Sequence, residues 1–164
     1  MPHVAAFGDA IRNDPAQQQK SQYVTFFQQP GAAETLFAAN DYAALKGIWN
    51  KSSPDEVQEY LSVFTQPGAL TAALNWYRGS RGIDPQDPQV TFGPVATPTL
   101  MVWGNQDPAI GRTAVTAAAD FMTGPYRFVE LDAGHWLVQE APERIAEEVV
   151  AHLARNRAPE GAAP

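Results

Sequence analysis

The chain has 164 residues, of which 45% are hydrophobic and 18% charged, a composition that suits one folded domain or a large part of one. Its net charge of -7, with only 11 Lys and Arg residues, argues against nucleic-acid and anionic-membrane binding, which both need clustered positive charge. The sequence has no Cys, which excludes disulfides and thiolate nucleophiles, and no apolar run approaches the roughly 18–20 residues of a spanning helix. We therefore expect a cytoplasmic chain.

The first half of the chain reads as a cluster of short helices. Over residues 3–79 apolar side chains recur at spacings of three and four, and the breaks DP, QPG and SSP separate the segments. The strongest helix start is the stretch SSPDE at 52–56, because Ser53 can cap the helix and Glu56 can complete a capping box. This pattern predicts a helical domain.

The second half alternates strands and helices. TLMVW, which starts at Thr99, is short and continuously apolar, as in a strand buried on both faces, and YRFVEL at 126–131 reads as a second strand. A helix is expected from about Arg112 to Met122 between them. Another is expected from Pro142 to about Asn156, with these side chains inward: Ile145, Val149, Val150 and Leu153. A right-handed crossover makes the strands parallel, so their carboxyl ends share the edge where ligands bind in open α/β sheets.

Two side chains follow the predicted strands at that edge. Asp107 and His135 each lie four residues after the last apolar residue of a strand. An Asp that accepts a hydrogen bond from one imidazole nitrogen fixes the tautomer, so that the other nitrogen can take a proton from a nucleophile or from water. The spacing alone leaves open that Asp107 is a turn residue and that His135 packs near Trp136.

The segments PTLMVWGNQDPAIG and LDAGHWLVQEAPERIAEEVVAHL resemble the C-terminal end of the α/β-hydrolase family, over about Val95 to Leu153. In that family the acid of the catalytic triad follows one late strand and the histidine follows the last. The resemblance implies that Asp107 is the triad acid and His135 the general base. It also implies an α/β class, as a partial α/β-hydrolase fold with a helical cap and a two-strand parallel β-α-β-α remnant of the core sheet.

Two helical segments narrow the resemblance to one kind of hydrolase. SQYVTFFQQPG and LNWYR resemble cap segments of epoxide hydrolases, in which one tyrosine from each donates a hydrogen bond to the epoxide oxygen. The matching residues here are Tyr23 and Tyr77, and phenols suit the role because opening an epoxide develops alkoxide charge. Core packing remains the alternative for each aromatic residue. The expected pocket residues are Phe26, Phe27, Trp76 and Trp136.

The nucleophile of that reaction is not found in this sequence. The resemblance implies an aspartate on a strand-to-helix elbow that forms an ester with the substrate, and His135 would then activate water to hydrolyse the ester. No G-x-[SD]-x-G elbow and no Gly-rich oxyanion loop occur in the chain. We therefore expect a fragment that is inactive alone, whose substrate would be a small hydrophobic epoxide and whose nucleophile would come from a companion N-terminal hydrolase fragment.

The expected organisation has four parts: a helical cap over 1–82, a proline-rich junction over 83–98, the core remnant over 99–156 and a disordered tail over 157–164. Two parallel strands cannot be covered on all sides by two helices, so we also expect an exposed apolar flank on TLMVW or YRFVEL and self-association as another possibility. No cofactor and no metal site are expected, because the three histidines are scattered and show no ligand spacing.

Two other functions remain open. The cap could serve as a non-catalytic small-molecule binding or interaction module, with the acid and histidine kept for structural reasons. The chain could also derive from a haloalkane dehalogenase-like enzyme or an ester hydrolase. A dehalogenase would need halide-binding N–H donors, typically from Trp, and the paired tyrosines favour an epoxide instead.

Overall fold

A computed structural model of the chain describes residues 2–79 and 92–157, and these divide into two compact units. Unit 1 joins Met1–Gln17 to Phe92–Pro164, and unit 2 is Gln18–Thr91. The first 17 residues thus group with the strands, whereas the expected cap domain over 1–82 included them. Residues 80–91, which hold most of the expected junction, and the tail from 158 onward lie outside the described residues.

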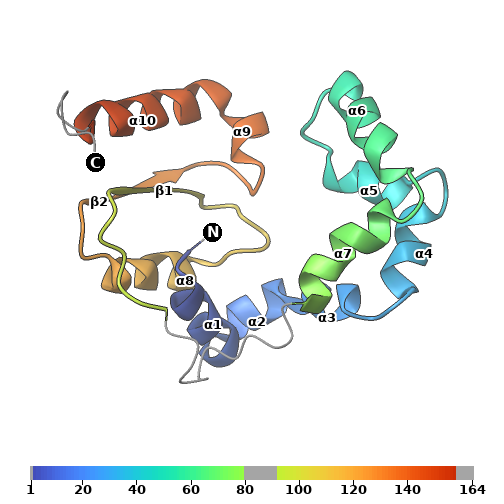
Figure 1. Cartoon of the computed structure of the whole chain (residues 1–164), viewed down its shortest axis with the longest axis horizontal. Helices are drawn as coiled ribbons and strands as arrows, with labels where there is room; N and C mark the ends of the chain where they lie inside the picture. Colours follow the sequence, from blue (N-terminus) through green and yellow to red (C-terminus); the bar gives the residue numbers. More distant parts are fainter. Residues whose placement is uncertain (1, 80–91, 158–164) are drawn as a thin grey trace, which may run out of the picture. The chain divides into compact units, whose positions relative to one another are not determined.

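Unit 1 contains the two predicted strands, which lie parallel as expected (Figure 1). The register runs from Thr99 opposite Tyr126 to Gly104 opposite Leu131. The helix predicted up to Met122 is shorter and tightens into a 3-10 turn. The elements in chain order are α1 Val4–Asn13, β1 Thr99–Gly104, α8 Arg112–Ala117, η2 Ala118–Phe121, β2 Tyr126–Leu131, α9 Leu137–Glu140 and α10 Pro142–Arg155.

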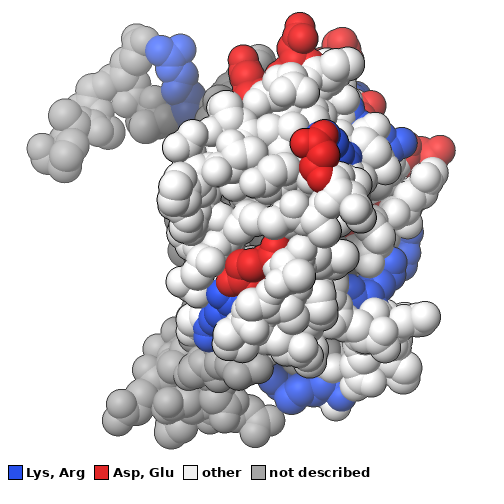
Figure 2. Space-filling view, turned by 90° about the vertical axis from the view of Figure 1, so that its right-hand side faces the viewer, with Lys and Arg blue, Asp and Glu red and all other residues white. Residues whose placement is uncertain are grey.

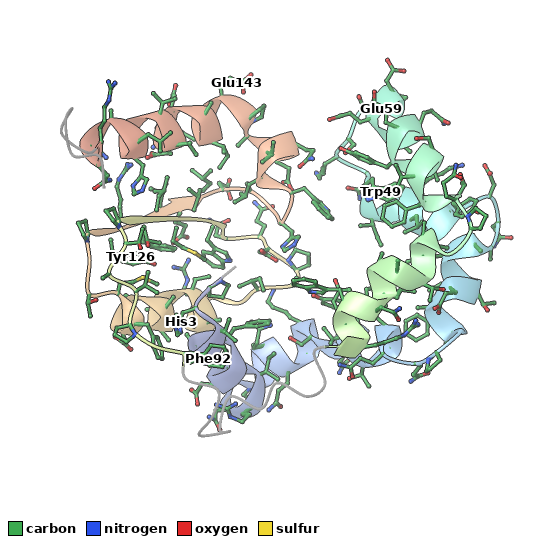
Figure 3. The ribbon with its side chains drawn as sticks, viewed as in Figure 1. His3, Trp49, Glu59, Phe92, Tyr126 and Glu143 are labelled. Carbon is green, nitrogen blue, oxygen red and sulfur yellow. The ribbon has the colours of Figure 1, made fainter. Side chains whose placement is uncertain are left out.

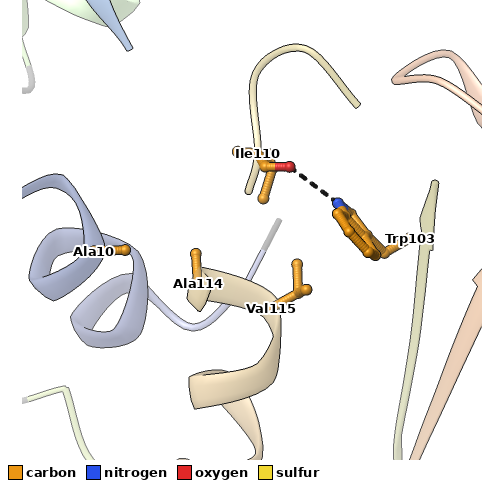
Figure 4. Close-up of a cluster of buried hydrophobic side chains, with 5 residues drawn as sticks. All are labelled: Ala10, Trp103, Ile110, Ala114 and Val115. Carbon is orange, nitrogen blue, oxygen red and sulfur yellow. Dashed lines mark hydrogen bonds between the residues drawn. The ribbon is translucent and has the colours of Figure 1, made fainter. Parts of the chain in front are cut away.

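The two strands lie between helices, with α10 over one face and α8 and α1 over the other (Figure 1). The buried core on the α8 side joins Trp103 of β1 to the loop that follows the strand and to the facing helices (Figure 4). Its buried members are Ala10, Trp103, Ile110, Ala114 and Val115. The loop between β1 and α8, where Asp107 lies, is therefore held by packing on its inner side.

The inward face predicted for α10 is wrong at three of its four positions. Val149, Val150 and Leu153 are 42%, 65% and 63% exposed. The side chain that α10 buries is Glu148, which forms an ion pair with Arg127 of β2. The side of α10 that carries Glu148 thus lies inward, whereas Val149, Val150 and Leu153 are exposed.

The described residues of unit 2 form helices joined by turns, as predicted. Its elements are the end of α2 Pro15–Lys20, then α3 Gln22–Phe27, α4 Ala32–Ala38, α5 Ala43–Ile48, α6 Pro54–Phe64 and α7 Ala69–Gly79. The buried centre is formed by Ala33, Phe37, Leu45 and Leu74. Trp49, labelled in Figure 3, packs beside it, with its ring centroid 5.2 Å from that of Tyr60.

The predicted capping box at the start of α6 is confirmed. The backbone N–H of Ser53 donates to Oε2 of Glu56 at 2.7 Å, and the backbone N–H of Glu56 donates to Oγ of Ser53 at 3.3 Å. Each side chain thus satisfies a backbone donor that the first helical turn leaves unpaired. These hydrogen bonds also hold the pKa of Glu56 below its usual value.

Figure 2 shows mainly uncharged side chains, with scattered acidic and basic ones. Two of the most exposed apolar side chains of unit 2 are Trp76, at 73%, and Val63, at 61%.

Across residues 2–79 and 92–157, no helix has the length and apolar character needed to cross a membrane.

Candidate active site

The predicted acid lies in a tight loop directly after β1. Oδ1 of Asp107 accepts hydrogen bonds from the backbone N–H groups of Ala109 at 2.7 Å and Ile110 at 2.9 Å. The indole N–H of Trp103 donates to the carbonyl oxygen of Ile110 at 3.1 Å, as Figure 4 shows. Asp107 is only 6% exposed. Its Oδ1 thus organises the loop in which the residue lies, and Oδ2 has a separate partner.

The predicted base meets that second oxygen. Nδ1 of His135 lies 2.8 Å from Oδ2 of Asp107, and the side chains of the two residues are 40% and 7% exposed. An ionised carboxylate can only accept, so Nδ1 carries the hydrogen, and Nε2 is the position at which a neutral ring can take up a proton. The sheet edge therefore brings together the two residues that the sequence placed on it.

Asp107 and His135 shift each other's pKa toward the charged form. The hydrogen bond to Asp107 raises the pKa of His135 above 6.5, although burial opposes this. For Asp107, burial raises the pKa, but the hydrogen bonds from His135 and from two backbone N–H groups outweigh it and bring the pKa below 3.8. The carboxylate thus stays ionised beside an imidazole that holds a proton more firmly than a free one.

Gly104, the last residue of β1, allows the two loops to approach. A Cβ at this position would lie 2.2 Å from the carbonyl oxygen of Gly134 and 2.3 Å from that of Ala133, closer than real Cβ contacts. A hydrogen bond also joins the loop after β1, which carries Asp107, to the loop after β2, which carries His135: the backbone N–H of Gln106 donates to the carbonyl oxygen of Ala133 at 2.9 Å. The glycine of the G-x-x-D pattern is therefore a steric requirement of the site.

Gln17 of α2 supports the loop that carries Asp107, and no sequence pattern singled it out. Its side chain is fully buried, its amide donates to the carbonyl oxygen of Ala109 at 2.8 Å, and its Oε1 accepts from the backbone N–H of Gly111 at 2.7 Å. It stands in a run of three glutamines, and nothing in the run distinguishes it from its neighbours.

Glu140 supports the histidine loop in a similar way. Its Oε2 accepts from the backbone N–H of Gly134 at 2.8 Å, and its Oε1 accepts from that of Trp136 at 3.3 Å. The residue stands in the segment that resembled the hydrolases, but no role followed from that likeness. The capping-box pattern would not have found it, because that pattern places the acidic residue three positions after the cap, whereas Glu140 lies four after Trp136.

The two predicted tyrosines come together within unit 2, from α3 and α7. The ring centroids of Tyr23 and Tyr77 are 6.0 Å apart with the rings nearly perpendicular, and Phe27 lies 5.3 Å from one and 5.0 Å from the other. Tyr23 is 36% exposed. Burial raises the pKa of Tyr77, and a hydrogen bond with Tyr23 acts in the opposite direction. The Tyr77 hydroxyl therefore remains protonated, and able to donate, at neutral pH.

The four expected pocket residues lie in different surroundings. Phe26 and Phe27 are partly buried against the core of unit 2, whereas Trp76 is 73% exposed. In unit 1, Trp136 is 38% exposed and stands edge-on to the ring of His135, with centroids 5.3 Å apart. Trp136 thus packs directly against the ring of His135.

No family model matches the chain. It is 33% identical over 156 residues to epoxide hydrolase 3 of Xenopus tropicalis, covering 88% of this chain and 41% of that protein. It is also 33% identical over 161 residues to the AB hydrolase superfamily protein YfhM of Bacillus subtilis, covering 93% of this chain and 54% of that protein. The chain thus spans between two fifths and just over half the length of these relatives.

Solved structures give the same fold. The epoxide hydrolase of Bacillus megaterium in complex with an inhibitor matches with a TM-score of 0.79 at 19% identity, over 93% of this chain and 57% of that one. One of the epoxide hydrolases from metagenomes of hot environments matches with a TM-score of 0.74 at 25% identity, over 93% and 56%.

These matches place the chain in the α/β-hydrolase superfamily and confirm the predicted partial α/β-hydrolase fold. Within the superfamily the chain is epoxide hydrolase-like, as its cap and histidine segments indicated.

Proposed function

We propose that the chain carries the water-activating half of an epoxide hydrolase site, with Asp107 and His135 as the acid and the general base. The observation that carries the proposal is the 2.8 Å hydrogen bond between Nδ1 of His135 and Oδ2 of Asp107, which fixes the tautomer and leaves Nε2 to remove a proton from water. That water would attack the ester formed when a carboxylate nucleophile opens the epoxide.

The tyrosine pair would serve the earlier step. Opening an epoxide places negative charge on its oxygen, and two protonated phenols can donate hydrogen bonds to it as that charge develops. The rings of Tyr23 and Tyr77 lie 6.0 Å apart and pack in one cluster with Phe27. This closeness supports a shared role for the two tyrosines. The expected substrate is a small hydrophobic epoxide.

The nucleophile would come from a companion segment that carries the aspartate elbow, and the chain alone would not turn over epoxides. Unit 1 exposes apolar side chains for which such a segment, or a second copy of the chain, would provide cover: Phe128, Val138, Val149, Val150 and Leu153. We expect light scattering to find self-association of the isolated chain, and a monodisperse monomer would contradict this point.

The test is complementation. The chain is mixed with, or joined to, the N-terminal segment of an epoxide hydrolase relative, and the hydrolysis of styrene oxide is compared with that of a chloroalkane and an ester. We expect the complemented protein to hydrolyse the epoxide, and we expect His135→Gln to abolish this turnover. Preferential turnover of the chloroalkane or the ester would favour the other hydrolase types. Binding of a diol without any turnover would favour a binding module.

The role of the tyrosines has its own control. Tyr77→Phe and Tyr23→Phe each remove one donor and should lower the epoxide turnover of the complemented protein by about ten- to a hundredfold. Tyr60→Phe removes a hydroxyl from the same unit, where the ring packs on Trp49, and should leave turnover unchanged. Equal effects of all three substitutions would contradict the assignment.

A further inference from the structure

Glu140 contacts the backbone on both sides of the predicted base. Its Oε2 accepts from the N–H of Gly134, the residue before His135, and its Oε1 accepts from the N–H of Trp136, the residue after it. The two carboxylate oxygens thus form a bracket around one residue. We propose that Glu140 is a positioning residue for His135, a role that rests on the proposed function of His135 as the general base.

Helix capping alone does not account for both contacts. Trp136 is the capping residue directly before α9 Leu137–Glu140, so an acceptor for its N–H is ordinary capping. Gly134 lies two residues before that position, in the loop that leads to the histidine. The shorter of the two hydrogen bonds, at 2.8 Å, is the one to this loop residue. The carboxylate therefore ties the loop before His135 to the helix after it.

The absence of a side chain at Gly134 makes the bracket possible. A Cβ there would lie 2.7 Å from Oε1 and 3.2 Å from Oε2 of Glu140, so the carboxylate occupies the space that a larger residue would need. The obstacle is the end of a flexible side chain, and an alanine at this position would therefore displace the carboxylate rather than the backbone. This gives a way to move Glu140 without changing its charge.

The charge of Glu140 acts on the base as well as its geometry. The carboxylate adds to the effect of Asp107 in raising the pKa of His135. Asp107 holds Nδ1 directly, whereas Glu140 acts through the backbone and through space. Replacing Glu140 by glutamine removes the charge and also places an amide N–H group against one of the two backbone donors, so a single acceptor remains for two N–H groups.

The experiment compares three variants of the full chain by NMR: Glu140→Gln, Gly134→Ala and the control Glu143→Gln. Glu143, labelled in Figure 3, is an exposed carboxylate in the first turn of α10. The readouts are the titration of the His135 ring, assigned by its loss in His135→Gln, and the hydrogen-exchange rates of the Gly134 and Trp136 amides. Neither readout depends on epoxide turnover.

In Glu140→Gln the His135 titration should move to lower pH, and the Gly134 and Trp136 amides should exchange about tenfold faster. Glu143→Gln should match the unaltered chain in both readouts. A folded Glu140→Gln variant that behaves like Glu143→Gln would overturn the proposal. Should Glu140→Gln fail to fold, Gly134→Ala decides: faster exchange at Trp136 supports the bracket, and unchanged exchange overturns it.

The outcomes also separate this inference from the proposed function. Shifts in titration and exchange without any epoxide turnover in the complemented protein would leave the bracket in place and refute the hydrolase role. Turnover that requires His135, together with unchanged titration and exchange in Glu140→Gln, would support the hydrolase role and refute the positioning role of Glu140.

Discussion

Asp107 and His135, 28 residues apart in the chain, are joined at the edge of the sheet by a hydrogen bond of 2.8 Å between Oδ2 and Nδ1. Because this bond raises the pKa of His135, Asp107→Asn should move the His135 titration to lower pH. In the complemented protein it should also reduce epoxide hydrolysis by about a thousandfold, since the amide no longer fixes the productive tautomer. An NMR titration and a rate measurement check the two effects. An unmoved titration would mean that the bond does not form in solution.

The pH dependence of stability follows from the same pair. The raised pKa of His135 gives a stabilisation that is fully present below 6.5 and is lost as pH rises through the folded value. The lowered pKa of Asp107 gives one that is present above 3.8 and is lost as pH falls through its folded value. The pair should therefore stabilise unit 1 most between these limits. Thermal unfolding of His135→Gln across pH should lack this maximum.

Much of the site could be predicted because it depends on local pattern and strand order. Two short apolar runs separated by a helix predict parallel strands, and parallel strands carry Asp107 and His135 to one edge. The supports of the two loops could not be predicted in the same way. Gln17 reaches Gly111 across 94 residues, and a contact of that range leaves no local pattern.

The face of α10 shows where pattern reasoning fails. Apolar periodicity predicted that Val149 and Leu153 face inward, but periodicity identifies only which residues share a face, and not what that face contacts. In unit 1 the buried side chain of α10 is Glu148, which is 3% exposed and pairs with Arg127. The partner of Glu148 lies on another element, 21 residues away in the chain, so the periodicity of α10 alone does not reveal it.

Gln17 should be costly to replace by an apolar residue of similar size. Gln17→Leu leaves the carbonyl oxygen of Ala109 and the N–H of Gly111 without this side chain, at about 2–4 kcal/mol in the free energy of unfolding. Urea denaturation measures the loss. Gln19→Leu, at an exposed position of the same helix, should change stability by less than about 0.5 kcal/mol. Equal costs would mean that Gln17 does not support the loop that carries Asp107.

Gly104→Ala tests the close approach of the two loops. The added methyl group would meet two backbone carbonyl oxygens that cannot rotate away, so we expect a loss of about 2–3 kcal/mol in the free energy of unfolding. Gly47→Ala serves as the matched control, because nothing lies within 4 Å of its Cβ position and the residue is inside α5. That change should stabilise the chain by about 0.5–1 kcal/mol. A harmless Gly104→Ala would refute the steric argument.

Acid should weaken unit 2 through Glu34. The guanidinium of Arg78 contacts both carboxylate oxygens, at 2.7 and 2.8 Å, and lowers the pKa of Glu34 from 4.5 to about 2. A lowered pKa gives stability that is present above 4.5 and is lost as pH falls toward 2. Glu34→Gln should cost about 1–2 kcal/mol at neutral pH and flatten this acid limb, and Glu59→Gln, at an exposed position, should do neither. Thermal unfolding between pH 2 and 7 measures both effects.

The ester intermediate offers the most direct test of the proposed water-activating role of His135. The complemented protein is incubated with styrene oxide, and the intact masses of its polypeptides are measured. With His135→Gln, we predict that a covalent adduct of one substrate mass builds up on the segment carrying the nucleophile, because the ester forms but water is not activated. The unaltered chain should show no lasting adduct and should release the diol. Rapid diol release by His135→Gln, without any adduct, would contradict the water-activating role of His135.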